Sequence, residues 1–467
     1  MAKMWSGRFA GGVDAQFEQW QRSFEFDQRL LPQELEASRA YALALANCGV
    51  LDRQEVADIT DALAQIGRTT NLPVRDADDA VEDVHHYVEL RLAAIIGETA
   101  LKLHSGRSRN EQIATDLRLY LREQCRACHD ALYALMASLV ERAETYRDDI
   151  MPAYTHLQRA EPMLVAHWLL AYFEMFKRDA HRIEDAAKRM NECPLGSGPV
   201  VGSTLPLDRE FLARELGFDR PCANSLDATA DRDFLLEYVN ALSQAAVHLS
   251  RLAEEMILFA SQEYGFVELP DAFSTGSSAM PQKKNPDAFE LMRAKAARVL
   301  ACATALASAQ KGLPLGYNKD LQELQPILFD ACDTALGALQ VAASLAKAVE
   351  FRVERMRAAA TSGYMNAMAM ATYLVNKGVP FRRAHEQVGA AVRYAIEKQC
   401  ELEDLGIDDL RHFAPLAEAD IYDALAVESV LNIHDVIGGT ARHRVASALA
   451  AANRMIAART EAEHAHA

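Results

Sequence analysis

The sequence predicts an all-α protein built around an elongated bundle of long helices. Apolar residues recur at steps of three and four through five long segments, strand-like alternation is sparse, and short breaks separate the helical stretches. Long striped helices with short breaks are typical of helix bundles. From these patterns we expect an N-terminal helical domain at 1–106, a central long-helix domain with the catalytic loops at 107–358, and a small C-terminal helical domain at 359–467.

Two shorter helices are predicted in the N-terminal region. The alanine-rich stretch 34–48 has apolar residues at helical spacing and is followed by Gly49, a residue type that commonly ends helices. The second helix is predicted over 81–92, and on spacing alone we interpret its polar cluster as a solvated face. The cluster consists of Glu82, Asp83, His85 and His86.

Five long helices are predicted through the centre of the chain. The longest runs from about 110 to 146 and carries one apolar stripe over roughly ten turns. The stripes are wider than the bundle of a single chain needs, so we expect the chain to associate with further copies of itself. The other four segments are 163–190, 231–263, 288–309 and 329–349.

The composition restricts the partners that we expect. The formal net charge is -17, which disfavours binding to nucleic acid or to an anionic membrane. The N-terminus has no apolar region typical of a signal peptide, and no apolar run reaches transmembrane length, so we expect a cytoplasmic protein. Cys125 and Cys128 have no second pair at zinc-site spacing, and their own spacing fits one helix face. We therefore expect no metal.

The loop at 274–290 is the main candidate for chemistry. It combines Gly276, Ser277 and Ser278 with Lys283 and Lys284, and a helical pattern begins near Asp287. Loop amides, a helix N-terminus and two ammonium groups would together stabilise an anion or a developing negative charge. The alternative is a solvated connector, which is the commoner role of such loops. Neither the phosphate-binding P-loop pattern nor the G-x-S-x-G pattern is present.

Three further loops complete the inventory of reactive groups. One carries Arg107, Arg109 and Asn110, whose side chains suit planar carboxylates. Another carries Thr155 and His156, and the third, 312–323, carries a tyrosine and a lysine. These groups hold carboxylates and move protons, so an elimination from a di- or tricarboxylate fits them.

Several short motifs, taken in their order along the chain, resemble those of a known family. GSSAMPQKKNP (276–286) resembles the signature of the fumarase/aspartase superfamily. From WSGRF (5–9) through SGRSRN, THLQ and YNKDLQ to GGTA, the chain resembles the argininosuccinate lyases of that superfamily. The resemblance implies cleavage of argininosuccinate to arginine and fumarate in arginine biosynthesis, without a metal or organic cofactor. It also implies a homotetramer with a twenty-helix core, in which each active site combines motifs from three subunits.

The resemblance also implies roles for individual residues. Ser277 is the expected base, Lys283 stabilises the anion, His156 is the acid or proton relay, and Glu290 hydrogen-bonds that histidine and raises its basicity. Ser23 is expected to contact the arginine end of the substrate. The remaining expected substrate contacts are Ser108, Arg109, Asn110, Thr155, Asn285, Tyr317 and Gln322.

Several departures from the family pattern bear on the substrate. Gln325 stands where a substrate-binding lysine is usual, and His86 stands where a threonine is usual. The first alternative is therefore a related C–N lyase for another N-substituted succinate, such as adenylosuccinate or an amine disuccinate. The second is a structural role of the kind that lens crystallins have, but the intact Ser277, His156 and Lys283 argue against it. Further departures are Glu161, Met368, Ala369, His434 and Val436.

Overall fold

A computed structural model describes residues 13–75 and 81–466 of the chain. Helices make up most of these residues, and the strands form four two-stranded pairings within the described ranges. The all-α prediction is therefore confirmed. The segment 5–9, which belongs to the family resemblance, lies outside the described residues.

The chain forms two compact units, and each is discontinuous in sequence. Unit 1 consists of the residues up to 129 together with 181–246 and 297–336. Unit 2 consists of 130–180, 247–296 and the residues from 337 onward. The three-domain boundaries at 106/107 and 358/359 remain sequence-based predictions.

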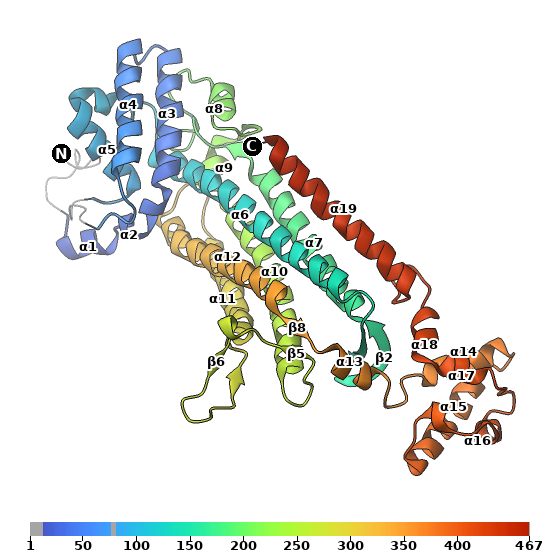
Figure 1. Cartoon of the computed structure of the whole chain (residues 1–467). Helices are drawn as coiled ribbons and strands as arrows, with labels where there is room; N and C mark the ends of the chain where they lie inside the picture. The colour runs from blue at the N-terminus through green and yellow to red at the C-terminus, as the bar shows by residue number, and fades with distance from the viewer. Residues whose placement is uncertain (1–12, 76–80, 467) are drawn as a thin grey trace. The chain divides into compact units, whose positions relative to one another are not determined.

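The N-terminal helices of unit 1 pack against one another (Figure 1). Helix α3 (Leu31–Asn47) is followed by Gly49, whose φ of 79° favours glycine, so the predicted helix end is confirmed. Helix α4 (Arg53–Thr69) begins with a capping box between Asp52 and Glu55. The other short helices of unit 1 are α1 (Ala15–Trp20), α2 (Phe24–Asp27), α5 (Val84–Ile96), α8 (Arg209–Glu215) and α9 (Ser225–Ala230).

The five predicted long helices are all present, with ends within a few residues of expectation. Their apolar stripes are buried, because the residues spaced three and four apart lie on one face. In the longest helix, for example, Leu117, Leu121 and Leu132 are fully buried. The five helices are α6 (Arg109–Thr145), α7 (Val165–Met190), α10 (Asp233–Ala260), α11 (Asp287–Gln310) and α12 (Leu324–Ala348).

One helical segment, Lys319–Ala348, is long and apolar enough to cross a membrane by length and composition, with a mean hydropathy of 1.2. Its Leu324, Leu328 and Leu339 are buried inside the protein. The helices of a protein core meet the same criteria, so this segment is weak support for a membrane span.

A β-hairpin replaces the turn that we expected between the first two long helices. Strands β1 (Ile150–Thr155) and β2 (Gln158–Leu164) pair so that His156 and Leu157 form a two-residue turn. Both turn residues have positive φ, 55° and 57°, as two-residue hairpin turns of type I′ require. The hairpin thus holds the predicted relay histidine at its tip, in a conformation that non-glycine residues seldom adopt.

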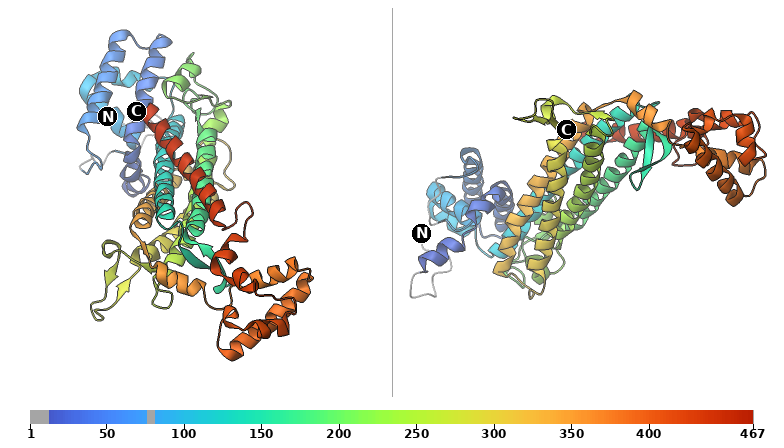
Figure 2. Two further views of the ribbon diagram at one scale, coloured as in Figure 1. Left: turned by 45° about the vertical axis from the view of Figure 1, so that its right-hand side comes forward. Right: turned by 90° about the horizontal axis from the view of Figure 1, so that it is seen from below.

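The last part of unit 2 contains a small helical cluster with a core of its own (Figure 2). Buried Met370, Leu374, Val388, Leu402 and Leu410 belong to this core. Its helices are α14 (Ala367–Asn376), α15 (Phe381–Lys398), α16 (Ile407–Phe413), α17 (Ile421–Leu425) and α18 (Val427–Asn432), with α13 (Val353–Ala360) before them and α19 (Arg442–His466) after them.

The remaining strands are two residues long. In unit 1, β3 (Glu192–Cys193) pairs in parallel with β4 (Arg220–Pro221). In unit 2, β5 (Val267–Glu268) pairs antiparallel with β8 (Glu350–Phe351). The third pair, β6 (Thr275–Gly276) and β7 (Lys284–Asn285), closes the base of the predicted catalytic loop and is described with the site.

Candidate active site

A pocket of about 220 Å³ in unit 1 gathers five of the predicted substrate contacts. They come from three separate parts of the chain: the start of α2, the start of α6, and the segment before α12. The five are Ser23, Arg109, Asn110, Tyr317 and Gln322. The other lining residues are Asp27, Glu82, Asp83, His85, Ile113, Lys319 and Gln325.

The pocket holds both signs of charge. Arg109 lies 3.3 Å from a carboxylate oxygen of Asp83 and 3.8 Å from one of Glu82, and the ammonium of Lys319 lies 3.9 Å from Glu82. Asp83 also caps α5 by accepting a hydrogen bond from the backbone amide of His86. Our interpretation of this cluster as a solvated face was therefore wrong for Glu82, Asp83 and His85, which line a pocket instead.

Asp27 is a buried carboxylate in the wall of this pocket, with 2 % of its surface exposed. It accepts hydrogen bonds from the Ser23 hydroxyl at 2.6 Å and from the Val84 amide at 3.0 Å. Burial, together with the neighbouring Asp83, raises the pKa of Asp27 from 3.8 to about 7. A cation entering the pocket would lower this pKa again and favour the carboxylate.

A buried polar group lies behind the pocket wall. Glu34, His85 and Asp116 each offer one ligand atom within 4.8 Å of one another, which is the spacing of a metal site. Glu34 already accepts hydrogen bonds from His85 Nδ1 and from the Ser38 hydroxyl, both at 2.7 Å. Burial and the Glu34 carboxylate raise the pKa of Asp116 well above its ordinary value. The raised pKa favours a protonated Asp116 beside an ionised Glu34 that is already held by its own hydrogen-bond donors.

The start of α6 fixes the arginine and the asparagine of the pocket. The Ser108 amide donates to Glu111 Oε1 at 2.9 Å, and the Ser108 hydroxyl accepts from the Asn110 amide at 3.3 Å. Ser108 is not among the pocket-lining residues. Arg107 is buried, donates to the Ser38 hydroxyl and lies over the Tyr41 ring. Of the two arginines in this loop, only Arg109 lines the pocket.

The predicted catalytic loop is tied at its base and exposed along its length. Thr275 and Asn285 pair across β6 and β7, and both the amide and the hydroxyl of Thr275 donate to Asp287 at the start of α11. The Ser277 hydroxyl oxygen accepts hydrogen bonds from the backbone amides of residues 279 and 280, at 3.2 and 3.1 Å. Figures 1 and 2 show that this loop projects from the helices of its unit.

The two lysines of the loop differ in their partners. Lys284 is held in ion pairs with Glu268 at 3.1 Å and Asp271 at 2.7 Å. Within the described parts of the chain, Lys283 makes no ion pair, and it is exposed. The ammonium of Lys283 is therefore the one that remains available to an anion.

The other predicted catalytic groups also lie in unit 2. Thr155 and His156 are exposed at the hairpin, and Glu290 is exposed in the first turn of α11. No hydrogen bond joins His156 to Glu290 within the chain, as far as residues 13–75 and 81–466 show. The predicted contacts thus divide between the pocket of unit 1 and the exposed loops of unit 2.

Comparison with known proteins identifies the family. The lyase family model matches residues 7–301, and the argininosuccinate lyase C-terminal model matches 364–432. The argininosuccinate lyase of Koribacter versatilis is 55% identical over 463 residues, which are 99% of each chain. The chain belongs to the argininosuccinate lyase family.

Other members and relatives agree with this assignment. The argininosuccinate lyase of Acidobacterium capsulatum is 53% identical over 97% of this chain and 94% of its own length. Among solved structures, an EDDS lyase in complex with formate is 28% identical, with a TM-score of 0.85 over 96% of this chain and 90% of the other. The family's helical architecture therefore extends over almost the whole chain.

The family resemblance did not point to every residue of the unit 1 pocket. Asp27 was missed, although it stands four residues after Ser23, a spacing that places both on one side of a helical turn. Glu82 and Asp83 were noted in the sequence but interpreted as solvent-exposed. Lys319 was noted only as part of its loop. For Asp27, the available signal was its position after Phe24 and Phe26, which suggests that this part of the helix is buried.

Proposed function

We propose that this lyase catalyses the reversible elimination of argininosuccinate to L-arginine and fumarate, as a cytoplasmic enzyme of arginine biosynthesis. The observation that carries the proposal is the mixed-charge pocket that collects Ser23, Arg109, Asn110, Tyr317 and Gln322. Argininosuccinate bears a guanidinium group and several carboxylates, so a site that binds it needs both signs of charge. The full-length similarity to argininosuccinate lyases supports the same substrate.

The charges in the pocket suggest how the substrate lies. Asp27, Glu82 and Asp83 suit the cationic end of the arginine portion, whereas Arg109 and Lys319 suit carboxylates. One feature specific to this chain, Gln325, modifies that arrangement. Gln325 lines the pocket with a buried Oε1 that lacks a hydrogen-bond donor, and so it offers the substrate an acceptor where the family pattern has a lysine.

In the proposed mechanism, Ser277 removes a proton from the succinyl carbon next to a carboxylate. The electron pair moves into that carboxylate as an aci-anion, and Lys283 stabilises the charge. The stored electron pair then returns to form the C=C bond of fumarate as the C–N bond breaks. The C–N electron pair leaves with the guanidinium nitrogen, and His156, supported by Glu290, supplies a proton to that nitrogen. Thr155 and Asn285 contact the substrate carboxylates, and Ser108 supports Arg109 and Asn110.

Local geometry supports Ser277 as the base and Lys283 as the anion-stabilising group of the loop. The Ser277 hydroxyl oxygen accepts two backbone N–H hydrogen bonds, which favour its deprotonated form. Lys283 keeps its charge unneutralised among the described residues, whereas Lys284 is ion-paired. Both observations favour Ser277 and Lys283 as the reactive members of this loop.

We propose a homotetramer with active sites shared between subunits. Apolar residues on α11 and α12 remain exposed in the single chain: Leu291 by 59 %, Leu300 by 43 % and Val341 by 41 %. Exposed apolar helix faces of this kind are typical of subunit interfaces. The exposed catalytic loop and hairpin in unit 2 fit the same proposal, because a second subunit could complete the site around them.

The test is a substrate panel with the purified protein. Fumarate formation, followed by ultraviolet absorbance, is measured with argininosuccinate, adenylosuccinate and an amine disuccinate, and kcat/KM is compared. A clear preference for argininosuccinate supports the proposal, and no fumarate from argininosuccinate at high enzyme concentration refutes it. The similarity to EDDS lyase and the presence of Gln325 favour the amine disuccinate as the second candidate substrate.

A further inference from the structure

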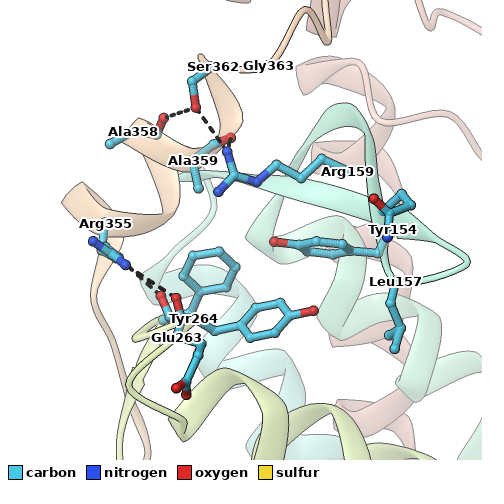
Figure 3. Close-up of a pocket in the computed structure, with 12 residues that line it drawn as sticks. Tyr154, Leu157, Arg159, Glu263, Tyr264, Arg355, Ala358, Ala359, Ser362 and Gly363 are labelled. Atoms are coloured by element: carbon cyan, nitrogen blue, oxygen red, sulfur yellow. Dashed lines mark hydrogen bonds between the residues drawn. The ribbon is translucent and has the colours of Figure 1, made fainter.

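A second and larger cavity, of about 700 Å³, lies in unit 2 beside the hairpin that carries His156 (Figure 3). Its volume is within the range of small-molecule sites. The hairpin, the loop after α10 and the segment around α13 each form part of its wall. Its lining includes Tyr154, Arg159, Glu263, Tyr264, Phe266 and Arg355, together with Ala358, Ala359 and Ser362.

The cavity includes the side of the hairpin that faces away from the Thr155 side chain. Tyr154 pairs with Arg159, and Thr155 pairs with Gln158, next to the two-residue turn. Neighbouring side chains of a strand point to opposite faces, so Tyr154 and Arg159 share a face that Thr155 does not. Thr155 itself does not line the cavity, although its cross-strand partner Gln158 does. A ligand in this cavity would therefore contact the hairpin beside the predicted carboxylate contact at Thr155.

Two arginines give the cavity a positive character. Arg159 Nη1 donates to the Ala359 carbonyl oxygen at 3.2 Å and to the Ser362 hydroxyl at 3.0 Å. Arg355 donates to the carbonyl oxygens of Tyr264 at 3.1 Å and Glu263 at 3.3 Å. All four partners are uncharged groups, and within the described residues neither guanidinium has an ion pair with a carboxylate. Each guanidinium has five N–H donors, and Arg159 also interacts with the Tyr154 hydroxyl, so both arginines keep donors for a ligand.

The one carboxylate side chain in the lining does not neutralise these charges. Figure 3 shows the Glu263 carboxylate pointing away from both Arg159 and Arg355. The excess positive charge is notable because the whole chain has a net charge of -17. The arginines thus form a local anion-attracting site that opposes the overall field of the protein.

Aromatic rings line the same cavity as the two arginines. The ring centroids of Tyr154 and Tyr264 are 5.6 Å apart, and those of Tyr264 and Phe266 are also 5.6 Å apart. The planes of Tyr154 and Tyr264 are inclined by 57° and those of Tyr264 and Phe266 by 90°, so the wall offers ring faces and edges to an aromatic ligand. Guanidinium groups, in turn, bind carboxylates through paired N–H donors. The combination therefore suits a small molecule with a carboxylate on a flat, apolar body.

We propose that this cavity binds a small aromatic carboxylate, and that the bound ligand lowers turnover by joining the His156 hairpin to α13. The binding step is independent of the proposed function, whereas the effect on turnover rests on the proposed role of His156. The cavity is formed with the hairpin in the position that its contacts with α13 define, so a ligand that binds it stabilises that position. It thereby opposes any movement of His156 that catalysis requires.

Calorimetric titration of the full-length protein with benzoate tests the binding step, and benzamide serves as the uncharged probe. We expect saturable binding of benzoate and at least a tenfold weaker affinity for benzamide. Arg355→Met removes one guanidinium, and Ala358→Trp fills the cavity while leaving every described side-chain hydrogen bond in place. Both variants should weaken benzoate binding at least tenfold. Arg357→Met, on the same helix but outside the cavity, should leave it unchanged.

The outcomes separate the possible failures. The proposed site is wrong if Ala358→Trp binds benzoate as tightly as wild type does. It is also wrong if wild type binds benzamide as tightly as benzoate. Both comparisons hold even if Arg355→Met misfolds. If benzoate binds as expected, steady-state kinetics should show a lower kcat at unchanged KM, an effect that Ala358→Trp removes. Binding without any change in kcat would refute the coupling to the hairpin. A protein that produces no fumarate from argininosuccinate would refute the proposed function, while the titration would still decide the cavity.

Discussion

The substitution Asp27→Asn should alter the pH dependence of stability in a predictable direction. In the folded protein, burial and Asp83 raise the pKa of Asp27 from 3.8 to about 7. The folded state therefore holds this proton more tightly than the unfolded state does. The resulting stabilisation is fully present below the unfolded pKa of about 4 and is lost as the pH rises through about 7. At 1.36 kcal/mol per pKa unit, the shift corresponds to a loss of about 4 kcal/mol in the free energy of unfolding. Because Asp27 and Asp83 interact, part of this loss belongs to the pair, and we expect about 2–4 kcal/mol for Asp27.

The asparagine variant should not pay this cost, because it has no proton to lose. Its amide can accept from the Val84 amide and donate to the Ser23 hydroxyl, which can reverse its role. We expect wild type and variant to have similar free energies of unfolding near pH 4. Above pH 7, the variant should be more stable than wild type by about 2–4 kcal/mol.

Urea unfolding at one protein concentration, at several pH values between about 4 and 8, measures this difference. Asp61→Asn, at an exposed position of α4, is the matched control and should give a constant difference from wild type. If the difference between Asp27→Asn and wild type is also constant over this range, Asp27 does not titrate as inferred, and the reasoning from burial is wrong.

Three further predictions concern the proposed active site. Ser277→Ala should lower kcat by about 10²–10⁴-fold because the base is lost, while calorimetry still detects argininosuccinate binding; a near-normal kcat would mean that the base lies elsewhere. His156→Asn should lower kcat by about 10²-fold with an unchanged circular dichroism spectrum, because only proton transfer is affected; unchanged kinetics would contradict the relay role. Mixing these two inactive variants after subunit exchange should restore part of the activity, since some mixed tetramers would contain complete sites. No recovery after verified exchange would indicate sites built from single chains.

Local patterns were sufficient to predict the long helices. The apolar stripe of α6 appears in the sequence as residues three and four apart, and the helix observed at Arg109–Thr145 closely matches the predicted 110–146. Gly49 ends α3 because its backbone needs a positive φ, which is again a local property. The hairpin at β1 and β2 was not predicted. Its turn consists of His156 and Leu157 and lacks the Asn-Gly or Asp-Gly signal that usually marks such turns.

The sequence by itself determined the helical architecture, the family and the residue types available for elimination chemistry, because periodicity and motifs are properties of neighbouring residues. Tertiary structure alone decided the environment of those residues. It buried Asp27 against Ser23 and brought Glu82 and Asp83 beside Arg109, although on spacing alone this cluster looked solvent-exposed. It also left Lys283 without an ion pair among the described residues while pairing Lys284. Burial and charge pairing depend on segments far apart in the chain, so spacing along the sequence cannot reveal them.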